Sequence, residues 1–176
     1  MAKFTLRLDR TINPKINGYG EHYALLSSLS LQMPDDSVLA DVGTYQGYSA
    51  VALARNPKVR VVTYDEIDFV TLALPKNVTR VLHVELERIA EIASADLVLL
   101  DVSPHDGDKE QKFFDELRRR SFEGILILDD IYWKLDKGMT SFWESITLKK
   151  IDVTAIGHYT GTGIVVFNPD KWDVEG

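Results

Sequence analysis

The chain has 176 residues, of which 45% are hydrophobic and 27% charged, and its formal net charge is -7. This composition predicts one soluble globular domain, and the acidic balance argues against a protein that holds nucleic acid through many phosphate contacts. The chain has no cysteine and no apolar run of about 18 residues, which excludes disulfides, thiolate metal sites and a cysteine nucleophile, makes a membrane span unexpected and leaves the cytoplasm as the expected location.

The N-terminal third predicts an arm followed by alternating helices and strands. Residues 1–18 are polar and contain turn signals, so they are expected to form a loop-like arm ahead of a single domain at 19–176. Apolar residues at helical spacing predict a packing helix from Tyr19 to about Gln32. Beyond it we expect a strand at 38–42, a helix at 47–55, a strand at 60–64 and a short helix near 68–73.

The same alternation continues to the end of the chain. Strands are predicted at 78–83, 97–100 and 125–128, and helices at 85–93, 108–120 and 139–148. Near-continuous apolar strands bounded by helices indicate a parallel sheet covered on both faces. Two further strands, near 151–156 and 164–167, flank the turn 160–163 and predict a hairpin, so one strand must run antiparallel. The predicted fold class is therefore α/β, Rossmann-like and doubly wound, with an antiparallel C-terminal hairpin.

A glycine turn follows the strand at 38–42. The turn Gly43-Thr44-Tyr45-Gln46-Gly47 leads directly into an alanine-rich helix, and such a strand, turn and helix N-terminus form a site for a phosphate or a carboxylate. The next strand ends at Asp65 and Glu66, where a carboxylate can accept hydrogen bonds from a ribose diol. Together these features predict a nucleoside cofactor.

Acidic residues gather at the predicted carboxyl ends of the strands. Ligands of open parallel sheets bind at this edge. Each acid taken alone is equally well explained as a turn former or a helix cap, but five at one edge favour a binding site. The five are Asp41, Asp65, Asp101, Asp129 and Asp130.

The segment DVGTYQGYSAVALA at 41–54 resembles the cofactor turn of class I S-adenosylmethionine-dependent methyltransferases. It is especially similar to the small-molecule O-methyltransferases of the catechol and caffeoyl-CoA types, whose turn reads like GTxxGYS. The segments LLDVSPHDG at 99–107 and LILDDIYW at 126–133 support the resemblance, and the first is also similar to FIDGDHSYEG of a related methyltransferase group. The resemblance covers roughly residues 20–168. It implies a seven-stranded sheet, S-adenosylmethionine as cofactor, and methylation of an oxygen or, as the weaker alternative, a nitrogen of a small molecule.

The resemblance also implies where the cofactor is held. Backbone amides after Gly43 would approach the methionine carboxylate, Asp65 or its neighbour Glu66 would accept from the ribose, and the segment from His83 to Glu85 would lie beside the adenine. The full set of cofactor-binding candidates is Asp41, Gly43, Thr44, Tyr45, Gly47, Tyr48, Ser49, Asp65, Glu66, His83, Glu85 and Asp101.

In metal-dependent members of the resembled family, the positions of Asp101, Asp129 and Asp130 ligate a divalent cation. Hard oxygen ligands suit magnesium or calcium, and the cation would lower the pKa of a substrate hydroxyl. The lysine that follows the first of these acids in many caffeoyl-CoA-type enzymes is not matched, because Lys109 comes too late. His105 then becomes the candidate general base, although it is equally well explained as a solvated loop histidine. The catalytic candidates are Asp101, His105 and Asp129, with Tyr132 and Trp133 shaping an acceptor pocket.

Two other functions remain open from the sequence. A nicotinamide-dependent dehydrogenase is disfavoured because Tyr45 stands where the dinucleotide fingerprint needs its second glycine. A non-catalytic nucleoside-binding sensor with the same fold is a second alternative. The expected partner is a small-molecule acceptor, and neither nucleic acid nor a membrane is expected. The basic run at 118–120 ends a predicted helix, where the helix dipole favours cations, so it does not indicate a nucleic-acid contact. A lid supplied by a second subunit would make the protein a homodimer.

Overall fold

The computed structural model describes residues 3–14, 21–83, 85–133 and 137–176. The helices are α1 (Tyr23–Ser30), α2 (Tyr48–Leu53), the 3₁₀ helix η2 (Glu85–Arg88), α3 (Ile89–Ile92), α4 (Asp108–Arg119) and α5 (Lys137–Ser145). The strands are β1 (Phe4–Arg7), β2 (Val38–Val42), β3 (Arg60–Asp65), β4 (Val78–Leu82), β5 (Leu97–Leu100), β6 (Ile125–Asp129), β7 (Lys149–Asp152), β8 (Thr162–Val166) and β9 (Trp172–Glu175).

Seven of these strands form one sheet in the order β4-β3-β2-β5-β6-β8-β7. Strands β2 to β6 run parallel to one another, whereas β8 is antiparallel to both β6 and β7. In this register Val42 lies beside Tyr64 of β3 and Leu100 of β5, so the carboxyl ends of the central strands meet at one edge. The predicted doubly wound, mostly parallel sheet with an antiparallel C-terminal part is confirmed.

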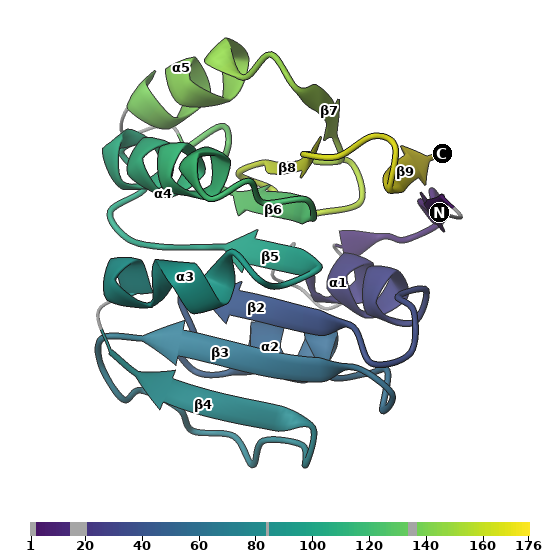
Figure 1. Cartoon of the computed structure of the whole chain (residues 1–176), viewed down its shortest axis with the longest axis vertical. Helices are drawn as coiled ribbons and strands as arrows, with labels where there is room; N and C mark the ends of the chain where they lie inside the picture. The colour runs from purple at the N-terminus through teal and green to yellow at the C-terminus, as the bar shows by residue number, and fades with distance from the viewer. Residues whose placement is uncertain (1–2, 15–20, 84, 134–136) are drawn as a thin grey trace.

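Helices cover both faces of the sheet (Figure 1). Successive strand residues point to opposite faces, so Leu39 and Val61 pack with α1 and α2, while Ala40 and Val98 pack with α3, α4 and α5. Every residue of β5 and β6 is buried. Apart from Asp129 at the end of β6, these strands are apolar because they have no solvent-facing side.

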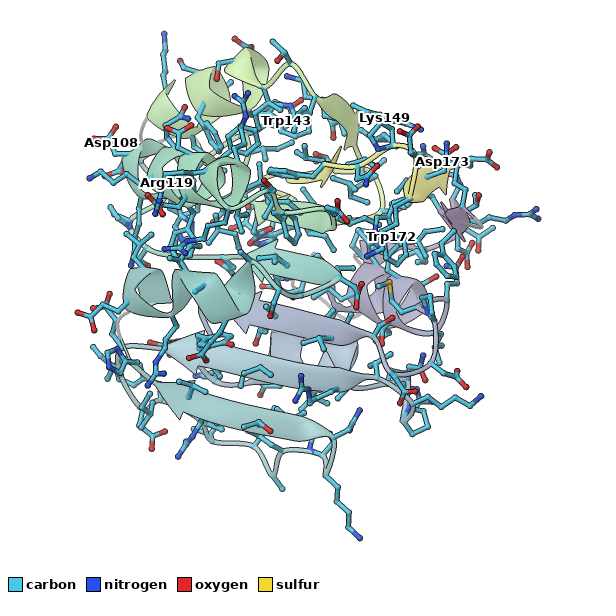
Figure 2. All side chains as sticks on the ribbon, viewed as in Figure 1. Asp108, Arg119, Trp143, Lys149, Trp172 and Asp173 are labelled. Carbon is cyan, nitrogen blue, oxygen red and sulfur yellow. The ribbon has the colours of Figure 1, made fainter. Side chains whose placement is uncertain are left out.

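The predicted arm at 1–18 contains a strand. Strand β1 pairs in parallel with β9, which brings two segments from opposite ends of the sequence side by side (Figure 1). Leu6 and Trp172 are 1% exposed and join the core on the α1 face. Lys149 of β7 and Lys3 both pair with Asp173 of β9, and Figure 2 shows Lys149 beside Asp173. The prediction of a loop is therefore wrong for residues 4–7, which form β1.

Residues 68–73 do not form the predicted helix. The Asp68 carboxylate accepts hydrogen bonds from the Val70 amide at 3.3 Å and from Arg80 Nη1 at 2.5 Å. An aspartate that bonds the backbone two residues ahead favours a turn over a helix, and the β-branched residues Val70 and Thr71 add little helix propensity.

The connection at the end of the sheet is longer than the predicted turn at 160–163. Strand β7 ends at Asp152 and β8 begins at Thr162. In the register of these two strands, Asp152 lies opposite Gly163. Gly163 therefore lies within a strand, and a Cβ at this residue would be 2.6 Å from the Trp143 ring. The residue is small because an aromatic ring of α5 packs on it, and not because the chain turns there. Among the helices that the structure describes, none combines the length and the apolar character needed to cross a membrane.

Candidate functional site

A pocket of about 460 Å³ opens at the carboxyl ends of β2, β3 and β5. The chain leaves β2 for β3 on one side, while β5 lies on the other side, so this is the switch point of the sheet, where ligands of such folds bind. Five of the predicted cofactor-binding residues line the pocket, and so does His105. The lining is Gly43, Tyr45, Asp65, Glu66, Ile67, Phe69, Asp101, Val102, Ser103, His105 and Lys109.

Gly43 sits where only glycine fits. Its φ is +101°, and a Cβ there would lie 1.7 Å from the backbone carbonyl oxygen of Asp101. The turn from β2 therefore passes directly over the end of β5. This close approach explains why the position holds glycine, and the turn lines the pocket beside the end of β5.

Asp65 connects the glycine turn to the end of β3. Its Oδ2 accepts a hydrogen bond from the Tyr45 amide at 2.8 Å, and its Oδ1 accepts one from the Ile67 amide at 3.0 Å. Each carboxylate oxygen keeps a further lone pair for a hydroxyl donor. The neighbouring Glu66 pairs with Lys109 Nζ at 3.4 Å, so Asp65 is the better placed of the two candidate acceptors.

Three predicted cofactor residues lie behind the turn and not in the pocket. Asp41, Thr44 and Ser49 are buried. Thr63 Oγ1 donates to Asp41 Oδ2 at 2.6 Å and lies 2.5 Å from Thr44 Oγ1. These two contacts connect the turn to the neighbouring strand β3 on its buried side. Burial raises the pKa of Asp41 to about 6, against the hydrogen bonds from Thr63 and Ser49 that lower it.

Three further predicted cofactor residues, Gly47, Tyr48 and His83, lie outside the pocket lining. Gly47, with a φ of +94°, begins α2, and the half-exposed ring of Tyr48 stacks on Tyr23 with centroids 5.8 Å apart. His83 Nδ1 pairs with Glu87 Oε2 at 3.0 Å. The side chain of Glu85 lies outside the described residues.

Asp129 lies between two histidines that the sequence prediction missed. Its Oδ1 is 3.1 Å from His22 Nδ1, and its Oδ2 is 2.9 Å from His158 Nδ1. Burial alone would raise the pKa of Asp129, but the two histidines hold that pKa below its ordinary value. Burial would lower the pKa of His22, and the charge of Asp129 raises it to about 9.

A second group of side chains joins this cluster to the pocket. His105 Nδ1 lies 3.4 Å from Asp130 Oδ2, and His105 Nε2 lies 4.0 Å from Asp101 Oδ1. Thr160 Oγ1 donates to Asp130 Oδ1. Burial and the negative charge of Asp129 raise the pKa of both Asp101 and Asp130. His105 thus lies in the pocket wall with its imidazole in contact with a carboxyl group.

The two aromatic candidates for the acceptor pocket differ in position. The Trp133 ring lies 5.7 Å from the His105 ring. Tyr132 instead donates its hydroxyl to Asp152 Oδ2 at 2.6 Å. Trp133 is therefore the aromatic side chain that adjoins the candidate base.

The possible metal ligands among the described residues form four overlapping triads, and each contains at least one histidine. In each triad one donor atom per residue lies within 4.8 Å of the others. This donor set is mixed, whereas magnesium and calcium prefer oxygen ligands. The expected trio of Asp101, Asp129 and Asp130 is not one of the triads, and its role stays a prediction. The triads are Glu21–His22–His158, His22–Asp101–Asp129, Asp101–His105–Asp130 and Asp129–Asp130–His158.

Comparison with known proteins finds similarity in structure and not in sequence. No protein-family model matches the chain, and no curated protein matches it significantly. The O-methyltransferase from Bacillus cereus in complex with SAH is 18% identical, with a TM-score of 0.58 over 82% of this chain and 80% of that one. Cofactor-bound Rv0187 from MTB is 17% identical, with a TM-score of 0.61 over 92% and 84% of the two chains. A methyltransferase from Geobacter sulfurreducens is 15% identical, with a TM-score of 0.58 over 82% and 76%.

The three proteins share the fold of this chain at 15 to 18% sequence identity. The chain therefore has the fold of the class I S-adenosylmethionine-dependent O-methyltransferases.

Proposed function

We propose that the protein is an S-adenosylmethionine-dependent methyltransferase that methylates an oxygen of a small molecule. The observation that carries the proposal is the pocket at the switch point of the sheet. The turn that begins at Gly43 and the carboxylate of Asp65 both line this pocket. One protein of similar fold was solved with SAH, the product that S-adenosylmethionine leaves after methyl transfer. The pocket volume of about 460 Å³ suits a ligand of this size.

The pocket offers a distinct contact to each part of the cofactor. The backbone amides of the turn after Gly43 would hold the methionine carboxylate. Asp65 would accept hydrogen bonds from the ribose hydroxyls, and Ile67 and Phe69 would form an apolar wall for the base. Tyr45 is 60% exposed and contacts Phe69 edge-on at 5.8 Å, so it closes the open side of this wall.

Methyl transfer needs alignment and a deprotonated acceptor, since the sulfonium is already activated. His105 would take the proton of the acceptor hydroxyl, and S-adenosylmethionine would supply the methyl group, with its sulfur leaving as a neutral thioether. Asp130, 3.4 Å from His105 Nδ1, stabilises the imidazolium that forms.

A labelled-methyl assay tests this proposal. Wild type, Asp101→Asn and His105→Gln are incubated with methyl-labelled S-adenosylmethionine and a panel of hydroxylated aromatic acceptors. Loss of the base is expected to reduce transfer by about 10²- to 10⁴-fold in His105→Gln. The affinity of His105→Gln for SAH, measured in parallel, should stay within about threefold of wild type, because a proton acceptor is not a binding group.

Asp115→Asn, an exposed change on α4, is the matched control for Asp101→Asn and should behave as wild type. Equal transfer by His105→Gln and wild type would contradict the assigned role of His105. Binding of SAH without transfer to any acceptor would instead favour the sensor alternative.

A further inference from the structure

Glu21, His22 and His158 lie together outside the residues that line the cofactor pocket. Glu21 and His22 directly precede α1, and His158 lies in the connection between β7 and β8. One donor atom of each residue lies within 4.8 Å of a donor atom of the other two. Two segments from distant parts of the sequence thus bring two imidazoles and a carboxylate to one point.

Asp129 fixes the orientation of both imidazoles. His22 Nδ1 and His158 Nδ1 each contact a different oxygen of this carboxylate, at 3.1 and 2.9 Å. An ionised carboxylate only accepts hydrogen bonds, so both Nδ1 atoms carry a hydrogen, and each ring offers a lone pair on Nε2 once a metal ion displaces the proton from that atom. Metal-binding histidines are held in this way, with the second ring nitrogen donating to a carboxylate.

The two Nε2 atoms lack ordinary hydrogen bonds among the described residues. His22 is 1% exposed, and its Nε2 is buried without a partner in the part of the chain that the structure describes. His158 Nε2 lies 3.7 Å from Glu21 Oε2, which is beyond hydrogen-bond length. Zinc bonds of about 2.0–2.2 Å to nitrogen and oxygen allow two ligands of one ion to be up to about 4.3 Å apart. The separation therefore fits two ligands of a shared ion.

We propose that Glu21, His22 and His158 form a site for a divalent transition-metal ion of the zinc class. His22 and His158 bind through Nε2, Glu21 binds through its carboxylate, and Asp129 orients both imidazoles. Two histidines and one glutamate are a donor set of zinc sites that keep a fourth position open. The side chain of Glu21 is 32% exposed, so water or a ligand oxygen can reach that position.

Titration of the chelator-stripped full chain with Zn²⁺ and Co²⁺ tests the site. We expect one equivalent of Zn²⁺ to bind in the presence of excess Mg²⁺, because imidazole ligands favour the transition ion. Co²⁺ should show the intense visible absorption of a four- or five-coordinate ion. Glu21→Gln and His158→Gln should each weaken Zn²⁺ at least tenfold, and Asp129→Asn should weaken it by about 10- to 100-fold.

The other histidines provide matched controls. The chain has four histidines, and the proposal assigns only two of them to the metal. His83→Gln and His105→Gln should keep the Zn²⁺ affinity within about threefold of wild type. His22→Gln removes a buried ring, so circular dichroism must first show that this variant folds. Glu21→Gln changes a partly exposed side chain and decides the question if His22→Gln does not fold.

Three results would overturn the proposal. They are an absence of stoichiometric Zn²⁺ binding to wild type, unchanged affinity in Glu21→Gln, and a loss of affinity in His105→Gln that matches the loss in His158→Gln. The last result would place the ion at the cluster of Asp101, His105 and Asp130. The titration contains no S-adenosylmethionine, so its outcome is independent of the proposed methyl transfer.

Discussion

Asp41 is a carboxyl group in the core, 0% exposed, and its Oδ1 has no hydrogen-bond partner among the described residues. Its pKa is about 6, against an ordinary value of 3.8, so between these values the native state holds a proton that the unfolded chain has released. The contribution of Asp41 to stability therefore falls as the pH rises through this window, by up to about 3 kcal/mol.

The Asp41→Asn variant isolates this effect because an amide does not titrate. Its free energy of unfolding in urea, compared with that of wild type at pH 4, 5, 6 and 7, should shift in favour of the variant as the pH rises. The difference should level off above pH 6. A difference that is constant across the range would show that Asp41 does not keep its proton in the native state.

The glycines of the cofactor turn should differ in their tolerance of a methyl group. Gly43→Ala puts a Cβ against the carbonyl of Asp101 at a φ of +101°, and the backbone must move to accommodate it. We expect a loss of about 2–5 kcal/mol in the free energy of unfolding and no measurable affinity for SAH. Gly47→Ala also has a positive φ but meets side chains and no backbone, Leu74 at 3.2 Å and Val70 at 3.5 Å, so it should cost about 1 kcal/mol. Urea unfolding and SAH titration of both variants compare the two sites, and equal effects would contradict the close approach at Gly43.

The two-stranded sheet of β1 and β9 anchors both ends of the described chain. Trp172 is buried between this sheet and α1 (Figure 2), whereas Phe4 is 41% exposed and touches Trp172 at 5.3 Å between centroids. Trp172→Ala should lower the free energy of unfolding by about 3–5 kcal/mol, and Phe4→Ala by about 1 kcal/mol. Urea unfolding measures both values. Similar effects of the two substitutions would mean that β9 is not part of the core.

The strands of the main sheet were predictable and β1 was not, for a physical reason. Strands β5 and β6 are buried on both faces, so the segments 97–100 and 125–128 are unbroken apolar runs that the sequence shows directly. In β1 only Leu6 is buried, and its partner β9 lies at the far end of the sequence. No local sequence pattern predicts such a pairing. The missing helix at 68–73 has a similar cause, because the Asp68 side chain selects a turn that periodicity does not reveal.

At the scale of the molecule, the acidic residues of the candidate site were predictable from the sequence, whereas two of its histidines were not. Asp65, Asp101 and Asp129 follow from one rule, since the carboxyl ends of parallel strands share an edge and turns there bind ligands. His158 lies on a connection without periodicity, and His22 lies in the predicted helix but ahead of α1, so only the tertiary fold brings them to Asp129. The sequence signal was limited to their residue type: histidine is the commonest metal ligand, and both lie next to segments that end at the carboxyl edge.

The central claim is that the pocket beside Gly43 and Asp65 binds S-adenosylmethionine. Calorimetric titration of wild type with S-adenosylmethionine, SAH and NAD tests it most directly, because no acceptor needs to be known. The account predicts one site with micromolar affinity for both sulfur nucleosides and none for NAD, since Tyr45 occupies the position where a pyrophosphate needs glycine. Binding of NAD, or no binding of either sulfur nucleoside, would contradict it.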